Sequence, residues 1–302
     1  MDTQAIAGAR LVDPHVLARI QDLELLARTV VDGFINGLHR APYFGASVDF
    51  AEHRGYVAGD DIRRVDWRIY ARTDRYFVKQ YEADTNANFA VLLDVSKSMG
   101  FASSGVSKLE YAKYLAACLA YLSYRQRDRV GITTFDEDLV AYVPPSAKHF
   151  NVLLHTLDRA SAERPGRLLP MLRLAAEHFK RRSIVALISD LYETPDDILD
   201  ALKPYRFLGN DLVVFHVLDP AEITFPYTDA SRFEDLETGE DAPVVPEVFA
   251  EQYRAMIREH IEALRSKCSE SRIDYVLIDT SKPLDEALFQ YLGNRERLMR
   301  VR

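Results

Sequence analysis

The feature that most constrains this sequence is a continuous apolar run, Phe89 to Leu93, that ends at Asp94. An apolar run without alternation predicts a strand that is buried on both faces, as in a parallel sheet covered by helices. A long helical pattern begins soon afterwards, at Ser107. Asp94, Ser96 and Ser98 therefore lie where a strand passes into a helix, which is the edge of an open α/β sheet where ligands bind.

These three side chains also suggest a chemistry. One carboxylate and two hydroxyls form a set of hard oxygen donors, which suits a small divalent cation such as Mg²⁺. A second continuous apolar run, Ser183 to Ser189, ends at Asp190. If the two strands are neighbours, Asp94 and Asp190 reach the same edge of the sheet. The alternative is structural, because Asp and Ser are common as turn formers and helix N-caps in such loops.

The rest of the chain predicts an α/β fold with a doubly wound, mostly parallel sheet in three layers. Residues 1–45 contain an amphipathic helix that begins at Asp13-Pro14 and runs to Leu38. Residues 46–86 form a segment rich in Arg, Asp and aromatic side chains, which we expect to pack on the main domain as an ordered polar network. Residues 87–302 alternate strands with helices, apart from an acidic hairpin insert near 221–245. We attribute the acidity of that insert to solvation.

The individual elements follow from the same patterns. We expect strands at 77–81, 129–135, 139–143, 211–218 and 275–278, and helices at 107–127, 148–160, 168–181, 196–207, 246–264 and from 284 onward.

Composition narrows the class of protein. The chain has 302 residues, of which 48% are hydrophobic, so a large core is available. The net charge of −8 argues against a nucleic-acid-binding surface. The presence of only two cysteines argues against a disulfide framework. No signal peptide is evident and no apolar run reaches the roughly 20 residues that cross a bilayer, so we expect a cytoplasmic protein without a membrane segment.

Other catalytic motifs are incomplete. Gly100 and Gly105 have the glycine spacing of a phosphate-binding loop, but Val106-Ser107-Lys108 follows where Lys and Ser or Thr should come at once. The histidines lack the spacing of a zinc site, and we interpret His216, in an apolar strand, as a core residue. Nothing in the sequence provides a nucleophile with its base.

The central residues resemble the metal-ion-dependent adhesion site of von Willebrand factor type A domains, which are doubly wound α/β domains. The resemblance implies that Ser96 and Ser98 contact Mg²⁺ directly, and that Asp94 and Asp190 contact it largely through water. It also implies an open position for a carboxylate of a partner protein. Such sites usually add a threonine, and Arg167 stands about where it is expected. A guanidinium there either replaces the cation or points away and leaves a weaker, degenerate site.

A longer stretch resembles domain-of-unknown-function family 58. The matching residues are Arg54, Tyr56, Gly59, Asp60, Asp61, Arg63, Asp66, Trp67 and Arg72. Proteins of this family pair the stretch with a type A domain and are typically associated with MoxR-type AAA+ ATPases. The resemblance therefore implies partnership with such an ATPase and its client proteins.

Our leading hypothesis is a non-enzymatic cytoplasmic interaction protein that binds partners through the metal-assisted edge and acts with a MoxR-type ATPase in protein assembly or remodelling. One alternative is a Mg²⁺-dependent phosphoryl hydrolase that uses the same acidic edge. Against it, Ser96 stands where aspartyl phosphatases need a second Asp, and no lysine is clearly placed for the phosphate. Another alternative is a structural subunit with an empty site.

Overall fold

A six-stranded sheet forms the centre of the molecule. The computed structural model describes residues 13–20, 22–38, 52–55, 70, 72, 74–80, 87–179, 182–229, 231–244 and 246–300. The strand order is β10-β7-β6-β3-β4-β5, in which all neighbouring pairs are parallel except the antiparallel pair of β4 and β5. The six strands are β3 (Asn88–Asp94), β4 (Arg129–Phe135), β5 (Leu139–Ser146), β6 (Ser183–Ser189), β7 (Asp211–Leu218) and β10 (Asp274–Asp279). The predicted α/β class and the mostly parallel sheet are confirmed.

The two apolar runs become adjacent strands. β3 and β6 pair in register from Asn88 opposite Ser183 to Leu93 opposite Ile188. Both are buried along nearly their whole length, because helices cover both faces of the sheet. Their carboxyl ends therefore meet, and Asp94 and Asp190 leave the sheet side by side.

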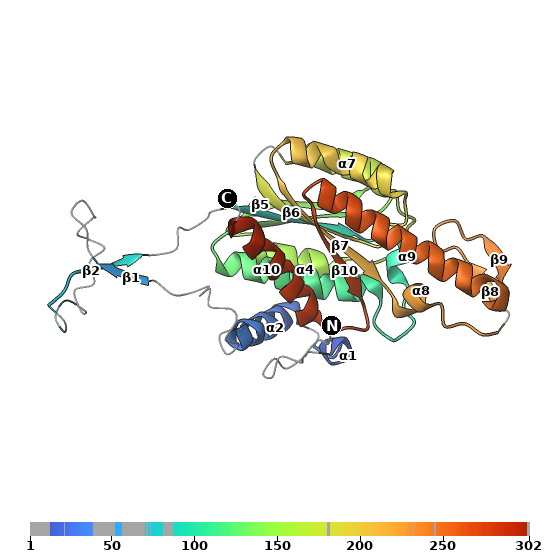
Figure 1. Ribbon diagram of the computed structural model, residues 1–302, viewed down its shortest axis with the longest axis horizontal. Helices are drawn as coiled ribbons and strands as arrows, with labels where there is room; N and C mark the ends of the chain where they lie inside the picture. Colours follow the sequence, from blue (N-terminus) through green and yellow to red (C-terminus); the bar gives the residue numbers. More distant parts are fainter. Residues whose placement is uncertain are drawn as a thin grey trace.

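Helices form a layer on each face of the sheet (Figure 1). One layer contains α4 (Lys108–Arg125), α5 (Phe150–Arg159) and α10 (Leu284–Arg300), and α2 (Leu23–Leu38) packs on α4 and α5. The other contains α6 (Leu168–Ala176), α7 (Pro195–Phe207) and α9 (Pro246–Glu270). Each layer packs on the alternate side chains of the same strands, which gives two hydrophobic cores.

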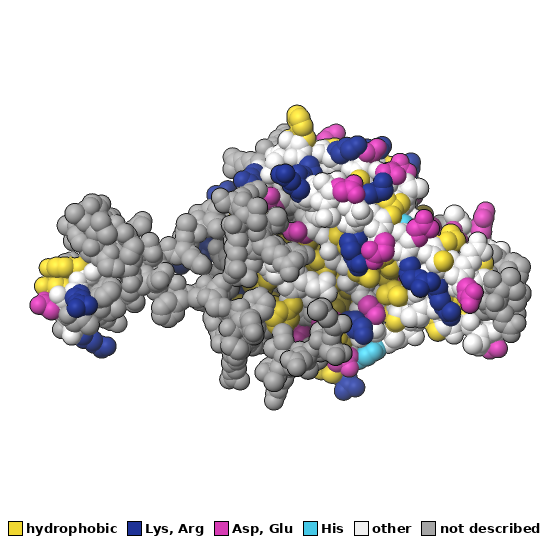
Figure 2. Space-filling model, in the orientation of Figure 1, with side chains coloured by type: hydrophobic (Ala, Val, Ile, Leu, Met, Phe, Trp, Pro, Cys, Tyr) yellow, Lys and Arg dark blue, Asp and Glu magenta, His cyan; other side chains and the backbone are white. Residues whose placement is uncertain are grey.

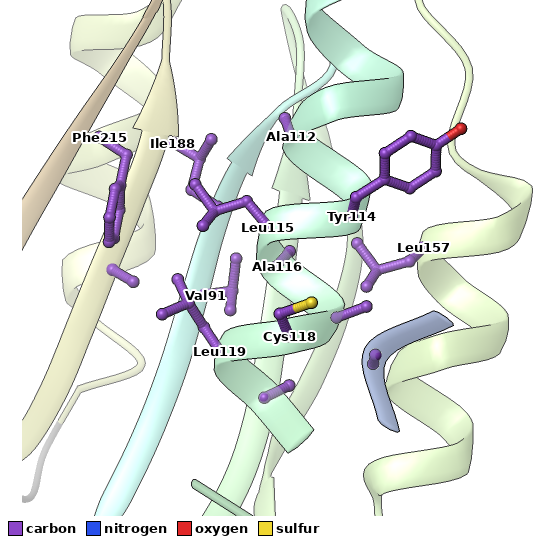
Figure 3. Close-up of a cluster of buried hydrophobic side chains, with 14 of the residues drawn as sticks. Val91, Ala112, Tyr114, Leu115, Ala116, Cys118, Leu119, Leu157, Ile188 and Phe215 are labelled. Atoms are coloured by element: carbon purple, nitrogen blue, oxygen red, sulfur yellow. The ribbon is translucent and has the colours of Figure 1, made fainter. Parts of the chain in front are cut away.

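Helix α4 is the centre of the first core (Figure 3). Ala112, Leu115 and Leu119 from this helix face Val91 of β3 and Ile188 of β6, and all five are fully buried. The helix begins with a capping box, in which Ser107 accepts from the Glu110 amide and Glu110 accepts from the Ser107 amide. This fixed start holds the loop after β3 at the sheet edge.

The N-terminal helix differs from the prediction. The expected single helix is divided into α1 (Pro14–Leu17) and α2 (Leu23–Leu38). Asp22 accepts hydrogen bonds from the amides of Glu24 and Leu25, so it begins a new helix where periodicity alone suggested continuity. Two short elements were also absent from the prediction, namely η2 (Lys97–Gly100) and α8 (Pro220–Thr224).

Two small antiparallel sheets complete the described structure. β1 (Glu52–Gly55) pairs with β2 (Phe77–Gln80), which lies where a strand was predicted. β8 (Ser231–Glu234) pairs with β9 (Asp241–Val244), so the predicted hairpin insert is present. Residues 56–69, which hold most of the family-58 stretch, lie outside the described residues. Its packing on the main domain and the three-part division of the chain stay predictions.

Two further observations concern the charge on the surface and the apolar character of the helices. Figure 2 shows basic and acidic side chains intermingled over the described part of the visible face, so neither sign of charge dominates there. Among the described helices, none is both long enough and apolar enough to cross a membrane.

Replacing Gly131 by alanine should destabilise the fold by about 2 kcal/mol, because an added Cβ overpacks a site already filled by backbone. A Cβ on Gly131, in β4, would lie 2.6 Å from the Val143 carbonyl oxygen and 2.7 Å from the Pro145 nitrogen. Gly33→Ala in α2 is the matched control, because nothing lies within 4 Å of that Cβ position. Urea unfolding of both variants measures the difference, and equal stabilities would contradict the prediction.

Candidate functional site

Asp94 is fixed in a buried position at the end of β3. One carboxylate oxygen, Oδ1, accepts a hydrogen bond from the Ser96 amide at 2.9 Å. The other, Oδ2, accepts from the Ser189 hydroxyl at 2.7 Å. Asp94 is only 4% exposed, so the sheet and the loop hold this carboxylate in one orientation.

The two serine hydroxyls of the loop lie beside each other. Ser96 Oγ and Ser98 Oγ are 3.1 Å apart, with Ser96 buried and Ser98 half-buried. Adjacent ligands of an octahedral Mg²⁺ ion with 2.0–2.1 Å bonds are about 2.9 Å apart. The hydroxyl spacing therefore fits two neighbouring positions around such a cation.

A second loop, residues 160–167, packs against the first. The Lys97 amide donates to the Arg164 carbonyl at 2.7 Å, and Arg164 binds both carboxylate oxygens of Asp136, which follows β4. This bidentate pair holds the second loop in place. Gly166 then touches Ser96, because a Cβ at Gly166 would lie 2.6 Å from the Ser96 Cβ. Only glycine fits here without a shift of one loop.

Asp190 forms an ion pair with Lys108, which the sequence analysis did not assign to the site. Lys108, the first residue of α4, places its Nζ 2.7 Å from Asp190 Oδ2 and 2.7 Å from Glu222 Oε1. The Lys108 side chain is fully buried, and its Nζ also lies 5.0 Å from the centre of the Tyr192 ring. Burial would lower the pKa of Lys108, but the two carboxylates outweigh it and hold the pKa above its ordinary value.

The site carries an excess of negative charge. Asp190 and Glu222 share the ammonium of Lys108, while the buried carboxylate of Asp94 forms its hydrogen bonds with the Ser96 amide and the Ser189 hydroxyl. Burial, and after it the charge of Asp190, raise the pKa of Asp94 to about 7. A cation next to Asp94 and the serine hydroxyls would offset this unfavourable charge.

A Mg²⁺ ion at this edge would be held by hydroxyls and a carboxylate rather than by carboxylates alone. Among the described residues, no group of three or more His, Cys, Asp or Glu side chains is arranged to hold a metal ion. The oxygens that could hold a cation are the hydroxyls of Ser96 and Ser98 and the Asp94 carboxylate, while Oδ2 of Asp190 is bound by Lys108. The four predicted residues lie together, while their role as metal ligands stays a prediction.

Arg167 does not replace the cation. Its side chain is exposed, and within the described structure its guanidinium forms no ion pair with Asp94 or Asp190. It is Lys108, not Arg167, that places a positive charge beside Asp190. His216 is a satisfied core residue as predicted, because Nδ1 bonds the Tyr275 hydroxyl and Nε2 donates to the Asp190 carbonyl.

The acidic hairpin contributes directly to the site, so attributing all its acidity to solvation was wrong. Glu237 lies in the turn between β8 and β9, and its Oε1 accepts a hydrogen bond from the Ser98 amide at 2.8 Å. Its Oε2 accepts from the Gly166 amide at 2.5 Å. One carboxylate therefore bridges the two loops that form the candidate site.

The missed residues left different signals in the sequence. Lys108 stands in the first turn of a helix, where the macrodipole disfavours a cation, so its placement indicated nearby carboxylates. Glu222 lies three residues after Asp219 in a capping box, a local pattern that does not reveal its bond to Lys108. Glu237 is one of several acids in the insert, and nothing local distinguishes it from Glu234 or Glu240.

Comparisons with known proteins identify the family of this chain. The family model described as "Protein of unknown function DUF58" matches residues 52–266. The chain is 27% identical over 234 residues to uncharacterized protein Rv1480 of Mycobacterium tuberculosis (strain ATCC 25618 / H37Rv). It has the same identity to uncharacterized protein Mb1516 of Mycobacterium bovis. Each match covers 75% of this chain and 73% of the relative.

Similar solved structures include two Bacteroides proteins and a type A domain. An aerotolerance-related membrane protein from Bacteroides fragilis aligns at 20% identity with a TM-score of 0.48, covering 68% of this chain and 98% of that one. BatB from Bacteroides thetaiotaomicron aligns at 19% identity with a TM-score of 0.47, covering 70% of this chain and 99% of that one. The SpRpn10 VWA domain aligns at 13% identity with a TM-score of 0.41, covering 68% of this chain and 94% of that one.

Proposed function

We propose that this chain, which belongs to the DUF58 family of proteins of unknown function and has a von Willebrand factor A-like fold, binds partner proteins at the carboxyl edge of its sheet. The fold and the family suggest a protein-interaction module. The observation that carries the proposal is the arrangement of Asp94, Ser96 and Ser98, whose oxygens gather on one fixed loop at that edge. The partner would supply an acidic side chain.

A Mg²⁺ ion would link the two proteins. Ser96 and Ser98 would hold it directly, and Asp94 and Asp190 would act mainly through water. When bound, the ion supplies an open coordination position that accepts a carboxylate oxygen. The chain's own residues do the rest, because the Ser189 hydroxyl and the Ser96 amide orient Asp94, and Gly166 packs on Ser96.

The partner in this proposal is a MoxR-type AAA+ ATPase, together with the client proteins that the two assemble or remodel in the cytoplasm. The support is the family membership and the buried carboxylates at the edge, where burial and the charge of Asp190 raise the pKa of Asp94 to about 7. No catalytic role is part of the proposal, since the buried groups of the site are engaged in orienting one another rather than in activating a nucleophile.

The hydrolase alternative requires a lysine that can contact a substrate phosphate, and Lys108 does not meet this requirement. Lys108 lies at the acidic edge, where the sequence analysis found no lysine clearly placed for the phosphate. Its ammonium is nevertheless fully buried between Asp190 and Glu222, so it does not face a substrate phosphate. Turnover of phosphomonoesters that disappears in an Asp94 variant would revive this alternative.

Asp94→Asn should abolish Mg²⁺-dependent binding while leaving the fold intact. Asparagine keeps the shape of the side chain and can still accept from the Ser96 amide, but it removes the buried charge that the cation needs. We expect binding to an immobilised MoxR-type ATPase of the same organism to fall at least about tenfold, within the range seen when groups that support a metal site are changed. Biolayer interferometry in Mg²⁺ measures this.

The controls separate the metal from the fold. Asp200→Asn removes an exposed carboxylate of α7 that pairs with Lys203, and it should bind like the wild type. Thermal unfolding should give Asp94→Asn a melting temperature equal to or above that of the wild type, because burying a neutral amide is less costly than burying a charge. Equal binding by Asp94→Asn and wild type in Mg²⁺ would contradict the metal-dependent site and assign the interaction to another surface.

A further inference from the structure

One residue in the turn of the β8–β9 hairpin, Glu237, binds two loops that are distant from it in the sequence. Glu237 binds Ser98, 139 positions away in the sequence, and Gly166, 71 positions away. The two amides belong to the two loops of the candidate site, and the serine hydroxyls lie next to them. A carboxylate of the chain itself therefore already occupies the edge at which the proposed function places a partner's carboxylate.

The hairpin is built to present this side chain. Asp235 accepts hydrogen bonds from the amides of Glu237 and Thr238, which tightens the turn, and Gly239 takes a φ of +72° that favours glycine. At its base, Phe233 stacks on Phe225 with ring centres 5.5 Å apart. The turn is thus shaped locally and anchored to α8 and α9, whose end of the molecule carries the hairpin (Figure 1).

The contact is also separable from the fold. Glu237 is partly exposed, and among the described residues the hydrogen bonds and ion pairs that join the hairpin to the two loops are those of Glu237 and a long Lys97–Glu234 pair of 3.9 Å. Bonds from backbone amides to a carboxylate are charge-assisted and stronger than neutral ones. Loss of this single carboxylate would therefore weaken the docking of the turn without removing core side chains.

We propose that Glu237 is a tethered acidic ligand, which occupies the position of the partner's carboxylate and must leave before an Asp- or Glu-bearing segment of the partner can bind. This inference rests on the proposed function and adds a regulatory step to it. Only molecules with an open hairpin can then bind the partner, so the apparent affinity equals the intrinsic affinity multiplied by the fraction of open molecules.

The experiment compares Glu237→Gln with Glu240→Gln. Both substitutions remove one negative charge from the same turn, but Glu240 is exposed, and no hydrogen bond or ion pair of its side chain is present in the described structure. If about a tenth of the wild-type molecules are open, Glu237→Gln should bind the MoxR-type ATPase up to about tenfold more tightly, while Glu240→Gln should match the wild type. Weaker binding by Glu237→Gln would overturn the proposal, because Glu237 would then help to bind the partner.

A second measurement needs no partner protein. Hydrogen exchange followed by mass spectrometry should show faster exchange at residues 96–98, 164–167 and 231–244 in Glu237→Gln than in Glu240→Gln. Acetate in place of chloride at equal ionic strength should produce the same change in the wild type, because a free carboxylate competes for the amides. Unchanged exchange in both tests overturns the tethered ligand. If no variant binds the ATPase but exchange changes as expected, the partner assignment fails and the hairpin contact stands.

Discussion

Replacing Lys108 by methionine is expected to lower the free energy of unfolding by about 3–5 kcal/mol, which is typical for removal of one partner from a buried ion pair. Methionine keeps an unbranched apolar side chain of similar length but leaves Asp190 and Glu222 without their shared ammonium. Both carboxylates contact Lys108 at 2.7 Å in a site where its side chain is fully buried. Urea unfolding at pH 7.5 gives the difference directly.

The pH dependence of this variant gives an independent check. Without Lys108, burial and mutual repulsion raise the pKa values of the remaining carboxylates above those in the unfolded chain. The folded state then binds more protons than the unfolded state, so the deficit of Lys108→Met should shrink as the pH falls. Lys203→Met, which removes an exposed lysine paired with Asp200, should change stability by less than about 0.5 kcal/mol at any pH. A similarly small loss in Lys108→Met would contradict the buried pair.

Lys108 also shows why the site was only partly predictable. The loop residues Asp94, Ser96 and Ser98 are close in sequence and follow a strand, so their position at the sheet edge follows from local pattern and α/β topology. Asp190 joins them because β3 and β6 are neighbours. Lys108 was noticed only as a misplaced phosphate-loop lysine, since its partners lie 82 and 114 residues further along the chain.

The same division holds for the fold. Buried strands such as β6 and capped helices such as α4 carry strong local signals, so they were predicted at nearly their observed bounds. The break after α1 was missed because one aspartate, Asp22, outweighs a continuous apolar stripe. The hairpin was predicted from its turn residues, but the docking of Glu237 depends on two loops that only the tertiary structure brings together.

Gly166→Ala should weaken Mg²⁺ binding by about 10- to 100-fold, the range seen when groups that orient metal ligands are changed. The added Cβ would lie 2.6 Å from the Ser96 Cβ and 3.2 Å from its hydroxyl oxygen. The loop that carries Gly166 is held by Arg164 on Asp136 and by the Lys97 amide on the Arg164 carbonyl. Ser96 therefore has to move, and its hydroxyl leaves the position beside Ser98. Calorimetric titration with MgCl₂ measures the affinity.

A matched glycine and a double-mutant cycle decide how this substitution acts. Gly293→Ala adds a Cβ in α10 where nothing lies within 4 Å, so it should leave Mg²⁺ affinity unchanged. If Gly166 acts through Ser96, then Gly166→Ala should have no further effect in a Ser96→Gly background, because both the Cβ that it clashes with and the hydroxyl that it displaces are already absent. Additive losses would instead mean that the loop itself, through the Gly166 amide and Glu237, controls the site. The cycle thus distinguishes displacement of the Ser96 hydroxyl from release of the hairpin that Glu237 attaches to the Gly166 amide.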